Sequence, residues 1–176
     1  MTENYKVLSF DPSLRNWGYA VCELTKQDND IQLNPITGGV IHSDNAKDVP
    51  YVNLRDLHTA SNIYDNVKQV LAEHKIDYLV AELPVGSQSA RAMASYGICI
   101  GLIGAIARET CIPLLSVTPA QVKKVVGEIT TTKEEIIAFA KNKYPQITDW
   151  LPKAKSKQEH ICDAIIAAHS LVTSEK

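Results

Sequence analysis

The order of strand-like and helical segments constrains the fold of this chain more than any other feature of its sequence. Three strand-like segments come first, at residues 5–10, 17–24 and 31–42, and short polar turns join them. Successive strands with short connections are typical of an antiparallel meander. From residue 51 onward the pattern changes to helical segments that alternate with short apolar strands.

The later segments follow a regular alternation. Apolar residues at three- and four-residue intervals predict a long amphipathic helix over 51–74. Thr118-Pro119 and Thr132 with Glu135 are typical helix starts. We expect further strands at 76–82 and 112–117, helices at 88–109, 118–126, 132–143 and 156–172, and a polar loop over 144–157. This order predicts an α/β fold with antiparallel strands first and strand-helix alternation afterwards.

Length and composition indicate one soluble domain. A chain of 176 residues can bury a single core, so we expect 1–176 to form one domain. With 45% hydrophobic and 22% charged residues, the composition excludes disordered and collagen-like classes. The longest nearly apolar stretch, 96–107, is shorter than a membrane span, so we expect an intracellular protein without a membrane partner.

The chain has four cysteines and no CxxC pair, which argues against a zinc site or a disulfide framework. We therefore expect Cys22, Cys99, Cys111 and Cys162 to be reduced core residues.

Charge is distributed unevenly along the chain. The formal net charge of −2 alone argues weakly against a nucleic-acid partner. Residues 119–157, however, contain eight lysines and four acidic residues. Such a basic stripe would suit a phosphate backbone, although a solvated helical face has the same composition.

Four side chains form a candidate reaction centre. Asp11 and Glu82 stand at the ends of the first and fourth strand-like segments, and ligand-binding groups of open α/β sheets lie at such strand ends. His160 and Asp163 are three residues apart in the last helix, so they lie on one face of it. If that helix packs beside the first and fourth strands, all four side chains converge.

Each of these residues also has a simpler interpretation. Asp11 before a proline could form an Asx turn. Glu82 could merely pair with Arg91 or Lys133, and His160 could be an ordinary surface histidine. Three converging carboxylates would repel one another unless a cation joined them, and carboxylate-rich sites suit Mg²⁺ or Mn²⁺. Two such ions per site promote phosphodiester hydrolysis.

Several motifs follow one another along the chain. They are Phe-Asp11-Pro-Ser-x-Arg-Asn-x-Gly18-Tyr19, Val-Ala-Glu82, Thr-Pro-Ala-Gln121-Val-Lys123, Lys133 and His160-x-x-Asp163, in this order. In these motifs the chain resembles the RuvC-type Holliday junction resolvases of the ribonuclease H-like nuclease superfamily. The resemblance implies a ribonuclease H-like fold with a mixed five-stranded sheet flanked by helices.

The resemblance also implies roles for particular residues. Asp11, Glu82, His160 and Asp163 would be catalytic and would bind two Mg²⁺ ions, for which Mn²⁺ substitutes. Lys123 and Lys133 would be catalytic lysines near the scissile phosphate. The spacing Gly97-x-x-x-Gly101-x-x-Gly104 indicates close packing against a sheet or against a partner subunit. By the resemblance, the helix around Gly97 and Gly101 would form a homodimer, whose two-fold symmetry suits paired nicks. We expect further DNA contacts from Arg15, Arg91, Lys123, Lys124, Lys133, Lys155 and Lys157.

The implied activity is that of a Mg²⁺-dependent endonuclease that resolves four-way or other branched DNA. Val85 departs from the resemblance, because well-studied members carry an aromatic residue there that stacks on bases at the junction centre. A broader branch specificity is therefore credible. The alternatives are a nuclease of the same fold acting on RNA–DNA hybrids or flaps, and a catalytically silent module that binds branched DNA. In a bacterium or phage, we expect such a protein in the cytoplasm, associated with the nucleoid.

Overall fold

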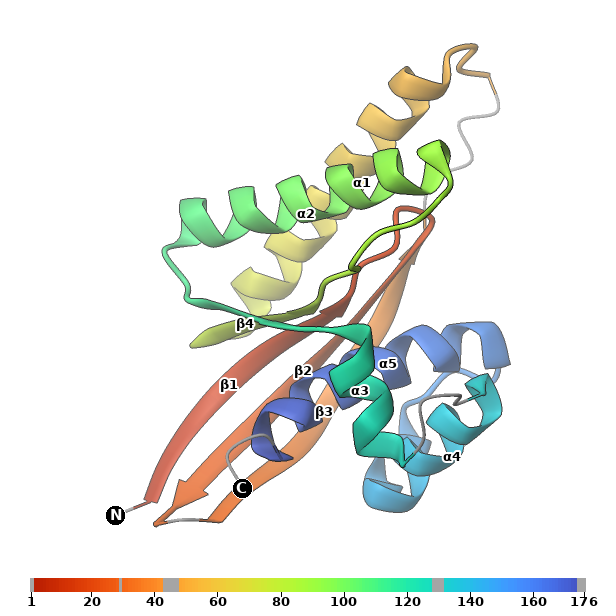
Figure 1. The fold of residues 1–176 in the computed structure, drawn as a ribbon. Coiled ribbons are helices and arrows are strands. Elements are labelled where there is room, and N and C mark those ends of the chain that lie inside the picture. Colours follow the sequence, from red (N-terminus) through yellow and green to blue (C-terminus); the bar gives the residue numbers. More distant parts are fainter. Residues whose placement is uncertain (1, 29, 43–47, 128–131, 174–176) are drawn as a thin grey trace.

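The chain folds into a mixed sheet with helices on both faces (Figure 1). The structure is a computed structural model that describes residues 2–28, 30–42, 48–127 and 132–173. Its elements, in chain order, are β1 (Thr2–Asp11), β2 (Asn16–Gln27), β3 (Asp30–His42), α1 (Val52–Glu73), β4 (Tyr78–Glu82), α2 (Ala90–Thr110), β5 (Leu114–Val117), α3 (Pro119–Val126), α4 (Lys133–Lys143), the 3₁₀ helix η1 (Pro145–Asp149) and α5 (Lys155–Thr173).

This order confirms the predicted succession of strands and helices, with one correction. Residues 144–157, expected to be a loop, contain η1, which has a proline at its start, and the first turn of α5. Proline is favourable there because its fixed φ suits the first turn and its missing N–H has no helical partner to lose. The capping box expected at Thr132 is present, and the N-cap expected at Thr118 also forms a capping box, with Gln121.

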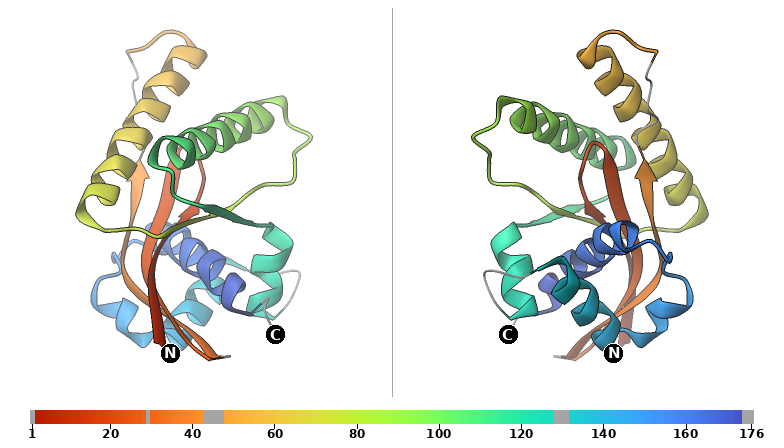
Figure 2. Two further views of the ribbon diagram at one scale, coloured as in Figure 1. Left: turned by 90° about the vertical axis from the view of Figure 1, so that its left-hand side faces the viewer. Right: turned by 90° about the vertical axis from the view of Figure 1, so that its right-hand side faces the viewer.

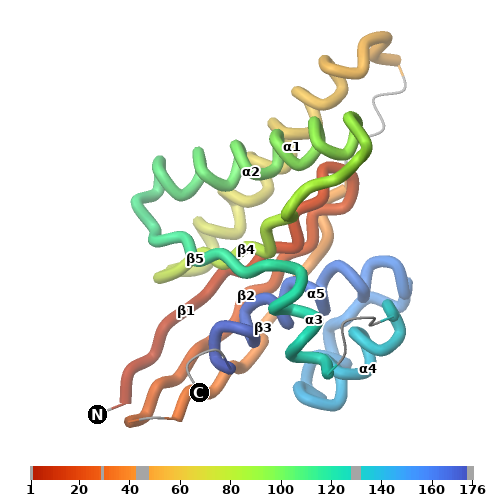
Figure 3. Tube along the Cα trace, in the orientation of Figure 1, coloured from red at the N-terminus to blue at the C-terminus, as the bar shows by residue number. Residues whose placement is uncertain are grey.

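The five strands are arranged in the order β3-β2-β1-β4-β5 (Figure 3). β1 pairs antiparallel with β2, and β2 pairs antiparallel with β3. β4 is parallel to β1, and β5 is parallel to β4. The mixed five-stranded sheet implied by the sequence is therefore confirmed.

Helices cover the two faces of the sheet unequally (Figure 2). α1 and α2 lie on one face, where they enclose a core with Leu8, Phe10 and Trp17. α3, α4 and α5 lie on the other face, where α5 contributes an almost continuous buried run from Ala164 to Ser170. A helix apolar on most sides is buried on most sides, so the sequence of α5 explains its central position.

Strand alternation decides which face the two strand-end acids occupy. Val7 and Val80 belong to the core beneath α5, whereas Leu8 and Leu79 belong to the core beneath α1 and α2. Side chains two residues apart share one face of a strand. Asp11 therefore lies on the α5 face with Val7, and Glu82 lies on the same face with Val80.

Gly18 lets the backbone of α5 come unusually close to the sheet. Gly18 is paired with Asp11 across the β1–β2 ladder. A Cβ atom added to it would lie 2.3 Å from the carbonyl oxygen of His160 and 2.7 Å from the carbonyl carbon. No side chain could be accommodated at these distances without moving backbone, so glycine is required for this docking of α5.

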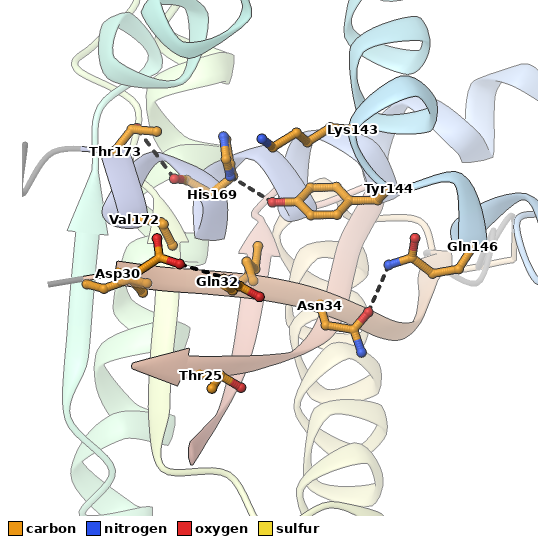
Figure 4. A pocket seen from close by; sticks show the side chains of 12 residues that line it. Thr25, Asp30, Gln32, Asn34, Lys143, Tyr144, Gln146, His169, Val172 and Thr173 are labelled. Carbon is orange, nitrogen blue, oxygen red and sulfur yellow. Dashed lines mark hydrogen bonds between the residues drawn. The ribbon is translucent and has the colours of Figure 1, made fainter. Parts of the chain in front are cut away.

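A polar pocket of about 670 Å³ lies at the other end of the β1–β2 ladder (Figure 4). It is lined by the start of β3, the end of α4 and the end of α5. Many of its polar groups bind one another: the Tyr144 hydroxyl is 2.7 Å from His169 Nδ1, and Gln146 donates to Asn34. Burial and the nearby Lys143 charge lower the pKa of His169, so this hydrogen bond is made by a neutral imidazole at neutral pH.

Replacing Gly18 tests the close docking of α5. We expect Gly18→Ala to lower the free energy of unfolding by at least about 2 kcal/mol, because the new methyl group would meet backbone atoms that cannot rotate away. Urea denaturation monitored by circular dichroism measures this change. Asp65→Ala, at an exposed position of α1, is the control and should change the free energy of unfolding by less than about 0.5 kcal/mol. Equal stability of Gly18→Ala and the unsubstituted protein would contradict the steric argument.

Candidate active site at the carboxyl ends of two strands

Asp11 and Glu82 lie side by side at the ends of neighbouring strands. β1 and β4 are parallel, and their register places Phe10 opposite Ala81. The next residue of each strand is the acid, so the two carboxylates leave the sheet at the same edge and on the same face. Parallel strands therefore bring together two acids that are 71 positions apart in the sequence.

α5 supplies the other two side chains of the group. His160 Nδ1 lies 2.7 Å from Asp11 Oδ2, and both side chains are only 21% exposed. This hydrogen bond raises the pKa of His160, although burial opposes the effect. Asp163 follows one helical turn later on the same face of α5. The convergence predicted from the sequence is thus present.

The carboxylates influence one another strongly. Burial raises the pKa of Glu82 to about 7, and the charge of Asp11 adds to the shift while Lys123 opposes it. Burial also raises the pKa of Asp163 to about 8, with further contributions from the charges of Asp11, Glu82 and Glu159. Such shifts mean that ionised carboxylates are costly here. A cation between them would offset that cost.

The donor set fits a divalent oxygen-seeking cation. Carboxylate oxygens are the ligands that Mg²⁺ and Mn²⁺ prefer, and three of the four side chains supply them. Within the described ranges, no group of three or more His, Cys, Asp or Glu side chains is arranged so that it could hold an ion as it stands. The acids are therefore electrostatically coupled but do not form a closed cage.

Two of the predicted lysines lie near these acids. The charge of Lys123 on α3 offsets part of the rise in the pKa of Glu82, and that of Lys133 at the start of α4 offsets part of the rise in the pKa of Asp163. Lys133 Nζ also contacts Glu159, at 2.8 Å from Oε1 and 3.0 Å from Oε2. Of the basic stripe, these two members are the ones the structure connects with the carboxylates.

The other predicted basic residues have different surroundings. Arg91 forms a bidentate ion pair with Asp56 of α1, with N–O distances of 2.5 and 2.6 Å. Neither Arg91 nor Lys133 pairs with Glu82, so the simpler interpretation of that acid is not realised. Exposed side chains are found at Arg15, Lys124, Lys155 and Lys157.

Sequence reasoning missed three residues near the site. Glu159 precedes His160 and is largely buried against Lys133. Cys99 of α2 is close enough to Asp11 for that charge to raise the thiol pKa, behind the larger effect of burial. The hydroxyl of Ser9, two residues before Asp11 on the same strand face, is buried without a hydrogen-bond partner among the described residues. Only Glu159 carried a signal in the sequence, as an acid four residues before Asp163.

The glycine-bearing face of α2 does not pack inside the chain. Gly97, Gly101 and Gly104 are exposed, and a Cβ on any of them would meet nothing within 4 Å. Close packing of these glycines against the sheet, one of two expectations from their spacing, is therefore wrong. By length and composition alone, α2 is the one described helix that could cross a membrane, and little of it is buried. What remains is an open face of small residues beside the exposed Met93 and Ile100.

Comparison with known families and structures gives a consistent result. The family model described as crossover junction endodeoxyribonuclease RuvC matches residues 7–170. A search of curated proteins found no match.

Solved resolvases share the fold. Thermus thermophilus RuvC in complex with a Holliday junction substrate superposes with a TM-score of 0.71 at 20% identity, covering 94% of this chain and 92% of that chain. The fowlpox virus resolvase complex with Holliday junction DNA gives 0.57 at 14% identity, covering 96% and 97%. The yeast mitochondrial Holliday junction resolvase gives 0.61 at 11% identity, covering 96% and 78%. The ribonuclease H-like fold implied by the sequence is thus confirmed.

Proposed function

The chain belongs to the RuvC family of crossover junction endodeoxyribonucleases, and we propose that it is a divalent-metal-dependent enzyme that cuts four-way and other branched DNA. The observation that carries this proposal is the meeting of Asp11, Glu82, His160 and Asp163 at one edge of the sheet. We assign these four side chains as catalytic metal ligands. Acting on DNA, the protein would work inside the cell.

The four ligands would hold two Mg²⁺ ions, with Mn²⁺ as a substitute. Bound there, such ions would make a water molecule more acidic and offset negative charge in the transition state for phosphodiester cleavage. The Asp11–His160 hydrogen bond fixes the orientation of both side chains before metal or substrate arrives. Hydrolysis of this kind would leave 5′-phosphate and 3′-hydroxyl ends.

The lysines would assist by placing positive charge near phosphoryl oxygens. The positive charge of Lys123 on α3 acts on Glu82, and that of Lys133 on α4 acts on Asp163. An ammonium held there stabilises charge that develops on the phosphate. We assign backbone contacts to Arg15, Lys124, Lys155 and Lys157, which are exposed, and to Arg91, whose side chain is 46% exposed beside Asp56.

We further propose that two copies pair through the open face of α2. Small residues at Gly97, Gly101 and Gly104 would let two helix backbones approach closely, and Met93 and Ile100 would be buried beside them. A two-fold dimer would present two identical sites, as paired symmetric nicks require.

The segment after β4 favours a broad range of branched substrates. Val85 lies three residues beyond Glu82 and is 83% exposed. An aliphatic side chain cannot stack on a base as an aromatic ring does. Flap and hybrid substrates are therefore included in the test of the proposed activity.

Cleavage of a labelled synthetic four-way junction in Mg²⁺ tests the activity. We expect paired nicks, abolished by EDTA, and rates lowered on the order of 10²-fold or more in Asp11→Asn and Glu82→Gln, because each removes charge needed in the transition state. Asp65→Asn and Glu23→Gln, which change exposed acids remote from the site, are matched controls. Undiminished cutting in the site variants would refute the assignment. Binding without products would indicate a silent module, and faster cutting of a flap or RNA–DNA hybrid would change the substrate.

Sedimentation analysis tests the dimer. We expect the protein to have twice the mass of its 19.4 kDa chain and Gly101→Leu to be monomeric, because the leucine would separate the paired helices. The variant should remain folded, since nothing lies within 4 Å of the added Cβ in one chain. Ala72→Leu, on the exposed surface of α1, is the control. A dimer that persists in Gly101→Leu would place the interface elsewhere.

A further inference from the structure

α4 lies beside α5 (Figure 1), and a side-chain contact between Lys133 and Glu159 joins the start of α4 to α5. Lys133 Nζ lies 2.8 Å from one carboxylate oxygen of Glu159 and 3.0 Å from the other. The backbone at each of the two residues is held in place by other contacts. The capping box of Thr132 and Glu135 fixes the first turn of α4, and Glu159 directly precedes His160 in the helix that docks on Gly18.

The two partners differ in their exposure to water. The Glu159 side chain is 15% exposed, whereas that of Lys133 is 72% exposed. A carboxylate largely removed from water is stable only with a charged partner, so burial of Glu159 favours its ion pair with Lys133. A free lysine with that exposure would sample many rotamers. The ion pair with Glu159 therefore limits the rotamers of Lys133, which its exposed position alone would leave free.

Helix geometry places this contact beside the carboxylate group. Glu159 and Asp163 are four residues apart, so they lie on the same face of α5 about 6 Å apart along its axis. An ammonium group has three N–H donors, and the two oxygens of Glu159 leave at least one of them for another acceptor. Lys133 is thus held next to Asp163 with a donor still available.

We propose that Glu159 is a positioning residue, which holds the Lys133 ammonium beside the carboxylates so that its remaining donor meets an oxygen of the scissile phosphate. This inference rests on the proposed function and deepens it. Glu159 itself touches neither substrate nor metal; its effect passes through Lys133. The substrate group recognised is a DNA phosphate.

A double-mutant cycle on junction cleavage tests the proposal. We expect Lys133→Ala to lower the single-turnover rate about tenfold or more, and Glu159→Ala to lower it by a similar factor, because both leave the phosphate without the positioned ammonium. The double variant should be no slower than Lys133→Ala, since the two residues act as one unit. Junction affinity in EDTA should change less than the rate.

Three results would overturn the proposal. Multiplied losses in the double variant would show that Glu159 acts independently of Lys133, for example as a metal ligand. A faster Glu159→Ala would show that Glu159 restrains the lysine unproductively. A cleavage rate of Glu159→Ala equal to that of the unsubstituted protein would show that Glu159 does not position Lys133 for cleavage. Failure to cut any DNA in the unsubstituted protein would instead contradict the proposed function, so the two failures are distinguishable.

A second readout needs no substrate. In ¹H–¹⁵N spectra of lysine side chains, we expect a signal for the ordered Lys133 ammonium that disappears in Glu159→Gln, which keeps the shape but not the charge of Glu159. Gln158→Ala is the matched control, because Lys141 Nζ donates to Gln158 at 2.9 Å and forms a similar α4–α5 contact outside the site. It should leave both the Lys133 signal and the cleavage rate within twofold of their original values. An unchanged Lys133 signal in Glu159→Gln would also contradict the proposal.

Discussion

The close approach of α5 to Gly18 is the constraint on which the site depends. His160 can reach Asp11 because the backbone of α5 lies where a side chain at position 18 would otherwise stand. The same docking sets the position of Asp163 one turn later and of Glu159 one residue earlier. The absence of a Cβ atom at Gly18 on β2 thus allows His160 to contact Asp11 at the end of β1 and brings Asp163 into electrostatic range of Asp11 and Glu82.

The sequence was sufficient to predict most elements and the four central side chains. Asp11 and Glu82 could be predicted because they end strands, and strand alternation then places both on one face. His160 and Asp163 could be predicted because three-residue spacing is local. The pairs Arg91–Asp56 and Lys133–Glu159 could not, because each joins residues on different helices, 35 and 26 positions apart, and depends on how those helices pack. The spacing of Gly97 and Gly101 indicated close packing but not whether its partner lay inside the chain.

The acids of the proposed active site lower the stability of the folded protein. Asp163 and Glu82 sit in surroundings that disfavour their ionised forms, and neither has an ion-pair partner of its own among the described residues. The pairs Lys133–Glu159 and Lys68–Glu109, by contrast, satisfy their charges directly. Unpaired buried acids at strand ends are therefore the part of the fold that a bound cation would stabilise most.

Binding of Mn²⁺ to the DNA-free protein, followed by calorimetric titration, tests most directly whether these acids form one cation site. We expect saturable binding by the unsubstituted protein, unchanged binding by Asp65→Asn, and loss of that binding in the folded double variant Asp11→Asn with Asp163→Asn. Equal Mn²⁺ affinity in the double variant and the unsubstituted protein would show that the four side chains meet without sharing a cation.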